Sequence, residues 1–271
     1  SSSSSTFSNE NASGNHINYG VREFGMSAIM NGMVLHGAIK PYGATFLVFT
    51  DYARNAVRLS ALMKLPNIFV YTHDSVALGE DGPTHQPIEH MVTLRSTPNL
   101  NNWRPADLVE TAVSWKSAVS SQKTPTCLIY SRQGTSAIKR SPDQISMIDM
   151  GGYLLEESDD FDLTIVASGS EVQLALDAAK ELKNDSINAN VVSMPCLDIF
   201  LDQDKEYQNK IINPEKPVLV VECAHPNSWY RILNRNDKVI GIETFGESAP
   251  GSDLLNHFGF NTDNVIKTAK S

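Results

Sequence analysis

The sequence contains few cysteines and no long apolar run. Its three cysteines, Cys127, Cys196 and Cys223, are odd in number, far apart, and each lies in or beside an apolar segment. This arrangement argues against a disulfide framework and a cysteine-based metal site, so we expect buried thiols in a reducing cytoplasm. No apolar run approaches the roughly 20 residues needed to cross a bilayer, which argues against a membrane-spanning segment.

Positive charge is also scarce in the sequence. The 271 residues include 22 lysines and arginines against 31 aspartates and glutamates, so the net charge is −9. An acidic chain without a basic cluster argues against nucleic acid or an anionic membrane as a partner. We find no secretory signal, no dinucleotide-binding fingerprint and no P-loop, and we therefore expect a cytoplasmic protein without a nucleotide site of those two kinds.

What the sequence does contain is an alternation of apolar runs and helical patterns. Residues 68–71, 126–130, 163–167 and 218–221 have the composition of buried strands. Most segments between these runs have apolar residues at helical spacing. The hydrophobic content of 41% is enough for real cores. The alternation predicts the α/β class, with two consecutive domains that each hold a mainly parallel sheet with helices on both faces.

Shifts in composition predict the boundaries of these domains. Residues 1–18 are polar and rich in serine, which indicates a disordered tail or the remnant of a linker. The first domain is predicted over residues 19–140 and the second over residues 141–271. A polar segment from about 133 to 150, which contains Pro142, is the candidate connection between them.

A helix is expected to open near Tyr19 and to run to about His36, with Gly37 just beyond its end. Glu23 falls in its first turn, where the helix dipole favours a carboxylate, and spacing alone supports only that structural role. The residues predicted to form its buried face are Val21, Phe24, Ile29, Met33 and Met30.

The most polar loop, residues 73–87, follows the apolar run 68–71. It holds two histidines, three carboxylates and two glycines, with little apolar side chain to bury. A loop of this kind at the end of a core strand is where α/β proteins place their chemistry, although a solvated connection has a similar composition. The histidines favour a functional loop. A metal role for His85 with His90 is weakly supported because a spacing of five suits no single helical face.

Three further features are candidates for binding. Phe46, Phe49 and Tyr52 are spaced three apart across a predicted strand–helix junction, where they form either core or a flat pocket for a planar heterocycle. Arg132 follows a predicted strand, where it either grips an anion or forms a surface ion pair. Residues 168–170, Ser-Gly-Ser, precede a predicted helix; a tight turn is favoured there over an anion site.

Several of these stretches together resemble the transketolase family, in that family's order and from about residue 14 to the end. The matching stretches are YGVREFGM (19–26), TFLVFTDY (45–52), YTHDS (71–75), GEDGPTHQP (79–87), SRQ (131–133), SGSEV (168–172) and TFGESAP (244–250). The resemblance implies a thiamine diphosphate enzyme of the pentose phosphate pathway. It would transfer a two-carbon ketol unit from a ketose phosphate to an aldose phosphate.

The resemblance also implies roles for individual residues on the cofactor side. Glu23 matches the catalytic carboxyl that hydrogen-bonds the aminopyrimidine ring of the cofactor. Phe46, Phe49 and Tyr52 match the aromatic pocket around that ring. Residues 19–140 would then be a pyrimidine-binding domain, and 141–271 the family's C-terminal domain.

On the substrate side, the resemblance assigns four residues. His85 matches a catalytic histidine over the reacting carbons, where it can stabilise developing charge. Asp81 matches a carboxylate that binds a sugar hydroxyl. His73 and Arg132 match groups that hold the phosphate end of the substrate, for which a histidine and a permanently charged guanidinium are suited.

One departure from the family pattern limits these expectations. Transketolases begin with a large domain that binds the diphosphate and its Mg²⁺ or Ca²⁺, and no counterpart is present; residues 80–82 resemble its metal motif only superficially. We therefore expect no metal site here, and a homodimer that needs the diphosphate-binding domain and is inactive alone. A fragment, an engineered piece and one subunit of a split enzyme all remain open, as do a dihydroxyacetone synthase type of enzyme and a non-catalytic dimerising subunit.

Overall fold

Runs of branched and aromatic residues form a first sheet in the computed structural model, which describes residues 4–271. The strands are β1 (Tyr42–Phe46), β2 (Ile68–Thr72), β3 (Asn101–Trp103) and β4 (Thr126–Tyr130). All pairs are parallel, in the order β1–β2–β4–β3. β4 spans the predicted run 126–130. Parallel pairing requires crossover connections, and helices supply them.

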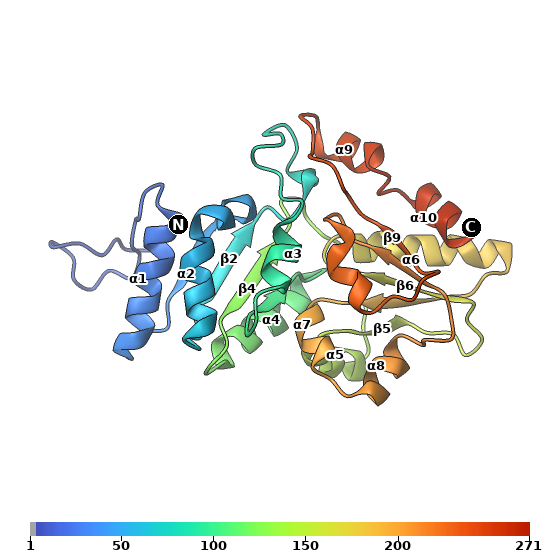
Figure 1. The fold of residues 1–271 in the computed structure, drawn as a ribbon, viewed down its shortest axis with the longest axis horizontal. Coiled ribbons are helices and arrows are strands. Elements are labelled where there is room, and N and C mark those ends of the chain that lie inside the picture. Colours follow the sequence, from blue (N-terminus) through green and yellow to red (C-terminus); the bar gives the residue numbers. More distant parts are fainter. Residues whose placement is uncertain (1–3) are drawn as a thin grey trace.

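Helices cover both faces of this sheet. They are α1 (Glu23–His36), α2 (Thr50–Leu62), α3 (His90–Arg95) and α4 (Leu108–Ser120), with 3₁₀ turns η1 (Leu47–Phe49) and η2 (Val76–Leu78). On one face, α1, α2 and α3 share a core cluster with β2 and β4, which includes Met30, Phe69 and Cys127. On the other face, α4 packs against β4, and Leu128 and Ala118 belong to a second cluster. Figure 1 shows α1 and α2 in blue at one end of the molecule.

The second sheet is built in the same way, with one exception in strand direction. Its strands are β5 (Tyr153–Glu156), β6 (Leu163–Ala167), β7 (Ala189–Ser193), β8 (Val218–Val221) and β9 (Lys238–Ile240). The order is β5–β7–β6–β8–β9, and only the β5–β7 pair is antiparallel. The predicted α/β class with two mainly parallel sheets is confirmed.

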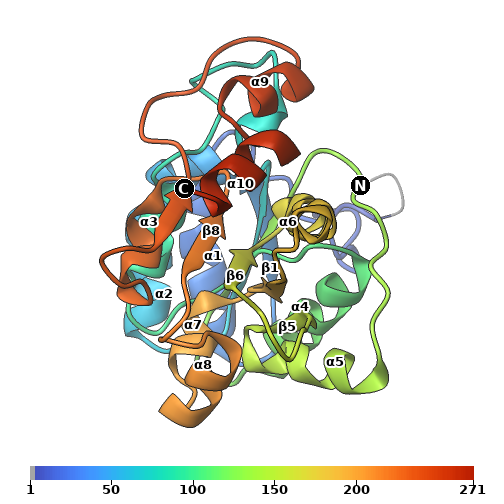
Figure 2. The same cartoon turned by 90° about the vertical axis from the view of Figure 1, so that its right-hand side faces the viewer.

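The second sheet is also covered on both faces. Its helices are α5 (Pro142–Met147), α6 (Glu171–Leu182), α7 (Leu197–Leu201), α8 (Lys205–Ile211), α9 (Gly251–His257) and α10 (Thr262–Ala269), with 3₁₀ turns η3 (Ile148–Met150), η4 (Lys183–Asp185) and η5 (Pro226–Arg231). α7, α8 and η5 cover one face. α6 and α10 pack against each other on the other face, as Figure 2 also shows. None of the helices within residues 4–271 is long and apolar enough to cross a membrane.

One continuous core connects the two sheets. Leu128 of β4 and Ile68 of β2 belong to the same buried cluster as Ile165 of β6 and Val172 of α6. The two halves therefore share apolar packing rather than meeting only through a flexible connection. This rigid arrangement fixes where loops from each half lie relative to the other.

Several local predictions are wrong in detail. α1 begins at Glu23 rather than near Tyr19, although it ends at His36 with Gly37 in the left-handed conformation, as expected. Its buried face is Met26, Ser27, Met30 and Asn31, and Val21 is 92% exposed. Of the predicted face, Met30 is buried as expected, but Phe24 and Ile29 are about half exposed, and Val21 precedes the helix.

Two other segments hold local structure that the sequence analysis did not predict. The connection near 133–150 holds α5, whose N-terminus has a capping box between Ser141 and Gln144. In the polar N-terminal segment, residues 1–3 lie outside the described residues. The following stretch folds back on itself, with the Phe7 amide donating to the His16 carbonyl at 2.8 Å. The three cysteines are free and buried, as predicted.

Candidate functional site

The predicted site lies where three parallel strands of the first sheet end side by side. Phe46 of β1 is the register partner of Thr72 in β2, and Thr72 is the partner of Tyr130 in β4. His73 directly follows β2, and Arg132 lies two residues beyond the end of β4. The carboxyl ends of parallel strands meet at one edge, so residues far apart in the sequence converge there.

The structure brings five of the predicted site residues into one aromatic cluster. The rings of Phe46 and Phe49 are nearly parallel, with centroids 5.9 Å apart, and Tyr52 lies 5.9 Å from Phe49. His73 packs edge-on against Phe46 at 4.8 Å, and His85 packs against Phe49 at 5.3 Å. The cluster therefore joins the residues predicted for a flat pocket to the two loop histidines.

Charged groups surround His73 within this cluster. Burial lowers the pKa of His73, and the nearby positive charge of Arg132 lowers it further, while Asp74 and Asp81 oppose this. The ring is therefore neutral at pH 7. Its buried Nδ1 has no hydrogen-bond partner among residues 4–271. Buried polar atoms are usually satisfied, so this nitrogen is available to a ligand.

The remaining predicted residues have few partners of their own. The carboxylates of Glu23, at the first position of α1, and of Asp81, in the loop, make no hydrogen bond or ion pair within the described residues. His85 Nδ1 shares a hydrogen bond with the Thr84 hydroxyl at 2.9 Å. The Arg132 guanidinium donates to the Leu78 carbonyl at 2.5 Å. Glu23 stays outside the aromatic cluster, on a helix that packs against α2.

The loop 73–87 is less solvated than its composition predicts. The stretch 74–79 is buried, and it includes the apolar turn η2. Only the tip, with Glu80, Asp81, Pro83 and Thr84, is exposed. The expectation of a loop with almost nothing to bury is therefore wrong, because three consecutive apolar residues anchor its first half.

A segment near the end of the chain braces this loop from the other half of the molecule. The Ser248 hydroxyl donates to the Glu80 carbonyl at 2.6 Å, and the Gln86 amide donates to the carbonyls of Gly79 and Glu247 at 2.8 and 2.9 Å. A Cβ on Gly251 would lie 2.5 Å from the Ala77 carbonyl oxygen, so the backbones touch. Figure 1 shows α9 beside this loop. A sequence signal for this segment was the stretch TFGESAP (244–250), which resembles the transketolase family but to which the resemblance gave no role.

Two family models cover most of the chain. Residues 1–136 match the transketolase pyrimidine-binding domain, and residues 151–261 match the transketolase-like C-terminal domain. The chain belongs to the transketolase family. It is 51% identical over 260 residues to transketolase 1 of Vibrio parahaemolyticus, with 95% of this chain and 39% of that protein covered. The chain thus spans about 39% of the length of such a transketolase.

Solved transketolase structures have the same fold. A Pichia stipitis transketolase in complex with sedoheptulose 7-phosphate has a TM-score of 0.93 and 42% identity, covering 99% of this chain and 40% of that one. A split-gene transketolase, described as an inactive beta4 tetramer, has a TM-score of 0.73 and 27% identity. That match covers 94% of this chain and 82% of the other.

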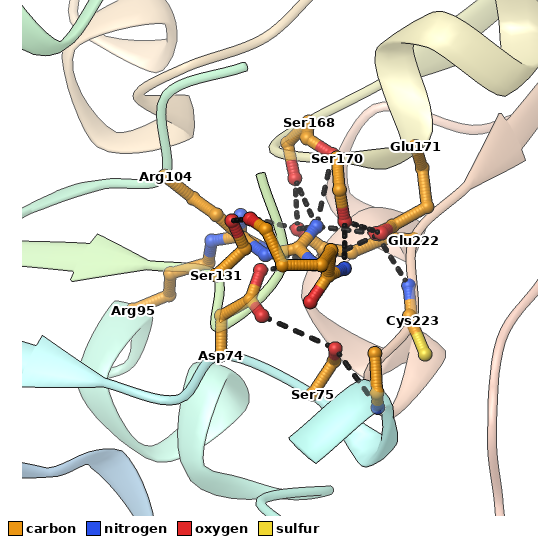
Figure 3. Close-up of polar contacts among 12 residues, drawn as sticks. Asp74, Ser75, Arg95, Arg104, Ser131, Ser168, Ser170, Glu171, Glu222 and Cys223 are labelled. Atoms are coloured by element: carbon orange, nitrogen blue, oxygen red, sulfur yellow. Dashed lines mark hydrogen bonds and ion pairs between the residues drawn. The ribbon is translucent and has the colours of Figure 1, made fainter. Parts of the chain in front are cut away.

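A buried ionic network in this transketolase chain joins the ends of both sheets, and it was not predicted. Figure 3 shows the Arg104 guanidinium among carboxylates from different elements. Arg104, which follows β3, donates to Asp74 at 2.8 Å and forms a two-pronged ion pair with Glu171 at the start of α6. It also donates to the carbonyl and hydroxyl of Ser168. The predicted tight turn at 168–170 thus contacts a buried cation.

Glu222, directly after β8, completes this network. Arg95 donates to both of its oxygens, at 2.7 and 2.8 Å, and the Trp229 indole donates at 2.7 Å. Burial disfavours the ionised form, but Arg95, Arg104 and the Ser168 hydroxyl outweigh it and lower the pKa of Glu222 to about 2. Glu222 is therefore fully ionised at neutral pH.

A second buried cluster fastens the segment between the two halves. Arg140 donates to Asp107 at 2.6 Å and to Glu110 at 3.2 Å, and its Nε donates to the Tyr153 hydroxyl at 2.6 Å. The hydroxyls of Tyr153 and Ser193 both donate to Glu110. The candidate linker is thus anchored by a buried arginine, although its polar composition suggested a free connection.

Proposed function

We propose that this chain is the catalytic half of a transketolase and transfers a two-carbon ketol unit from a ketose phosphate to an aldose phosphate. The observation that carries the proposal is the convergence of Phe46, Phe49, His73 and His85 at one sheet edge. Membership of the transketolase family supplies the reaction class. The activity belongs to the assembled enzyme, because the chain spans 39% of such a relative.

The residues present fit the ring end of thiamine diphosphate. The rings of Phe46 and Phe49 are nearly parallel and Tyr52 is 67% exposed, so flat aromatic surface remains available to a planar heterocycle. When bound, the cofactor supplies the nucleophilic carbon that carries the two-carbon unit. In this proposal Phe46, Phe49 and Tyr52 hold and orient its ring and exclude water from it.

Glu23 is proposed as the residue that shares a proton with a ring nitrogen. Its side chain is half-buried at the start of α1, and its carboxylate has no competing partner within residues 4–271. A carboxylate that is close to a ring nitrogen in a dry pocket can hold a proton there and return it. Glu23 and His85 are the proposed catalytic residues.

The substrate is proposed to lie along the polar side of the cluster. His85 donates a hydrogen bond to substrate oxygens and stabilises negative charge that develops on them. Asp81 binds a sugar hydroxyl, and His73 with Arg132 holds the phosphate end. The Pichia stipitis complex with sedoheptulose 7-phosphate supports a sugar phosphate as the substrate class.

The other half of the site is proposed to come from a partner. A diphosphate-binding domain outside this chain would hold the diphosphate with Mg²⁺ or Ca²⁺, and the assembly would be a homodimer of complete units. The split-gene relative described as an inactive beta4 tetramer supports a chain that assembles without turnover on its own.

The wider context of the chain is also part of the proposal. We assign residues 19–140 to the pyrimidine-binding domain, 141–271 to the C-terminal domain and 1–18 to a linker remnant. The enzyme would work in the cytoplasm, in the pentose phosphate pathway. Three free buried thiols support a reducing compartment.

A reconstitution assay tests this function. The chain is mixed with the diphosphate-binding part of the Vibrio parahaemolyticus relative, thiamine diphosphate and Mg²⁺, and ketol transfer from xylulose 5-phosphate to ribose 5-phosphate is followed. We expect no turnover by the chain alone and turnover by the mixture. Glu23→Gln should lower kcat of the mixture by about 100-fold or more, because it removes the proton-sharing carboxylate.

The matched control is Glu206→Gln, which removes an exposed first-turn carboxylate from α8 and should leave kcat unchanged. Assembly of the mixture without turnover would overturn the catalytic assignment in favour of a dimerising subunit. Faster transfer to formaldehyde than to ribose 5-phosphate would indicate a dihydroxyacetone synthase type of enzyme instead. Turnover by the chain alone would show that the diphosphate site lies within it.

A further inference from the structure

We propose that Asp51, Glu89 and His90 form a binding site for a divalent transition-metal ion such as Zn²⁺. The three residues lie at the first turns of α2 and α3, and one potential ligand atom from each lies within 4.8 Å of the others. This inference is independent of the proposed function.

The histidine is the observation that points to a ligand. Only 4% of the His90 side chain is exposed, yet neither ring nitrogen has a hydrogen-bond partner within the described residues. Nε2 lies 3.3 Å from an Asp51 carboxylate oxygen, and Nδ1 lies 3.9 Å from a Glu89 oxygen. Buried polar atoms are nearly always satisfied, so a buried imidazole between two carboxylates without a hydrogen bond requires an explanation.

A shared metal ion explains this arrangement. Zn²⁺ lies about 2.0–2.2 Å from imidazole nitrogen and carboxylate oxygen, so two ligands on one ion are about 3.3 Å apart at tetrahedral angles. The separation between His90 Nε2 and Asp51 matches that spacing. Glu89 lies nearer the other ring nitrogen, Nδ1, and its exposed carboxylate would have to turn toward Nε2 to share the ion with Asp51, with water completing the coordination.

The donor set selects the class of metal. One imidazole with two carboxylates suits Zn²⁺, Co²⁺ or Mn²⁺ better than Mg²⁺, which prefers oxygen ligands alone. Asp51 adjoins Tyr52, so the ion would tie the aromatic wall of the candidate site to the start of α3. Its role would be to hold these two helix termini together and to stabilise the fold.

A titration of the untagged chain with Co²⁺ tests the proposal. We expect visible absorption bands from nitrogen and oxygen coordination, one ion per chain, without the sulfur charge-transfer band that a cysteine ligand would give. Saturating Zn²⁺ should raise Tm, and EDTA should reverse the rise.

His90→Gln should weaken binding by roughly 100-fold. Because His90 is buried and this variant can fail to fold, Asp51→Asn and Glu89→Gln, at exposed positions, should each weaken binding by about tenfold or more.

His257→Gln is the matched control, because His257 faces a single carboxylate, Glu247, at 3.9 Å on an exposed surface. It should leave the Co²⁺ spectrum and the rise in Tm unchanged. Absence of Co²⁺ bands would overturn the proposal and leave the direct contact between His90 and Asp51 as the explanation of the arrangement. Bands that persist in both Asp51→Asn and Glu89→Gln would place the ion elsewhere and also overturn it.

Discussion

The edge of the first sheet and the buried network around Arg104 differ in whether their polar and charged groups have partners within the chain. At the edge, the Asp81 carboxylate makes no hydrogen bond or ion pair within the described residues, and Nδ1 of His73 is left without a hydrogen bond. In the network, each carboxylate is paired with an arginine while fully buried. The edge groups are those assigned to ligands in the proposed function, whereas the carboxylates of the network already have charged partners within the chain.

Removing the centre of the network should therefore have the largest effect. Arg104→Met leaves Asp74 and Glu171 buried without a counter-charge and should lower the free energy of unfolding by about 3–5 kcal/mol, measured by urea denaturation. Asp81→Asn, at the edge, should change it by less than about 0.5 kcal/mol.

A surface ion pair provides the control for this prediction. Lys116 contacts Asp149 at 2.6 Å, but both side chains are exposed. Lys116→Met should cost less than about 1 kcal/mol, because solvent screens the pair. Equal losses from Arg104→Met and Lys116→Met would contradict a special role for the buried network.

The contribution of Glu222 to the free energy of unfolding should depend on pH. Its pKa of about 2 in the folded chain lies below the ordinary 4.5, so its contribution is complete above pH 4.5 and is lost as the pH falls toward 2. The shift corresponds to about 3 kcal/mol at neutral pH.

The measurement is the urea midpoint of the wild-type chain and of Glu222→Gln between pH 2 and 7. The difference between the two should be largest near pH 7 and should narrow below about pH 4.5. A difference that does not depend on pH would mean that Glu222 stabilises through hydrogen bonding to Trp229 and Ser168 rather than through its charge.

The smallest effect should come from the brace between the two regions. Ser248→Ala removes the hydrogen bond to the Glu80 carbonyl and should lower kcat/KM of the reconstituted enzyme by about fivefold, the equivalent of ~1 kcal/mol. Ser252→Ala, an exposed residue in α9 with only a local contact to Asp253, is the control. A loss confined to the unfolding free energy, with kcat/KM intact, would show that the brace serves stability alone.

Local sequence patterns predicted the strands well. β4, β6 and β8 match the predicted runs because a short, buried apolar run has few alternatives in an α/β chain. Helix faces were less predictable. Leu108, the first residue of α4, is apolar but 81% exposed, because Asp107 caps the helix and sets its phase so that Glu110, Ser114 and Ala118 face the core.

The sequence also predicted part of the candidate site, because the order of parallel strands determines which residues lie at one sheet edge. Strand ends place Phe46, His73 and Arg132 at one edge, and that convergence follows from the parallel topology alone. The positions of Arg104 and Glu222 had no such signal, because a single charged residue next to an apolar run also occurs at surfaces. Their partners, Glu171 and Arg95, come from distant segments, and pairing over that distance is a property of the tertiary fold.

The brace from the end of the chain has a consequence for how the protein is made. Glu80 and Ser248 are 168 residues apart, and Gln86 and Glu247 are 161 apart. A ribosome that has just released the loop 73–87 must add every residue up to Ser248 before these contacts can form. The loop that carries His85 therefore lacks these hydrogen bonds until the ribosome has released residues 247 and 248.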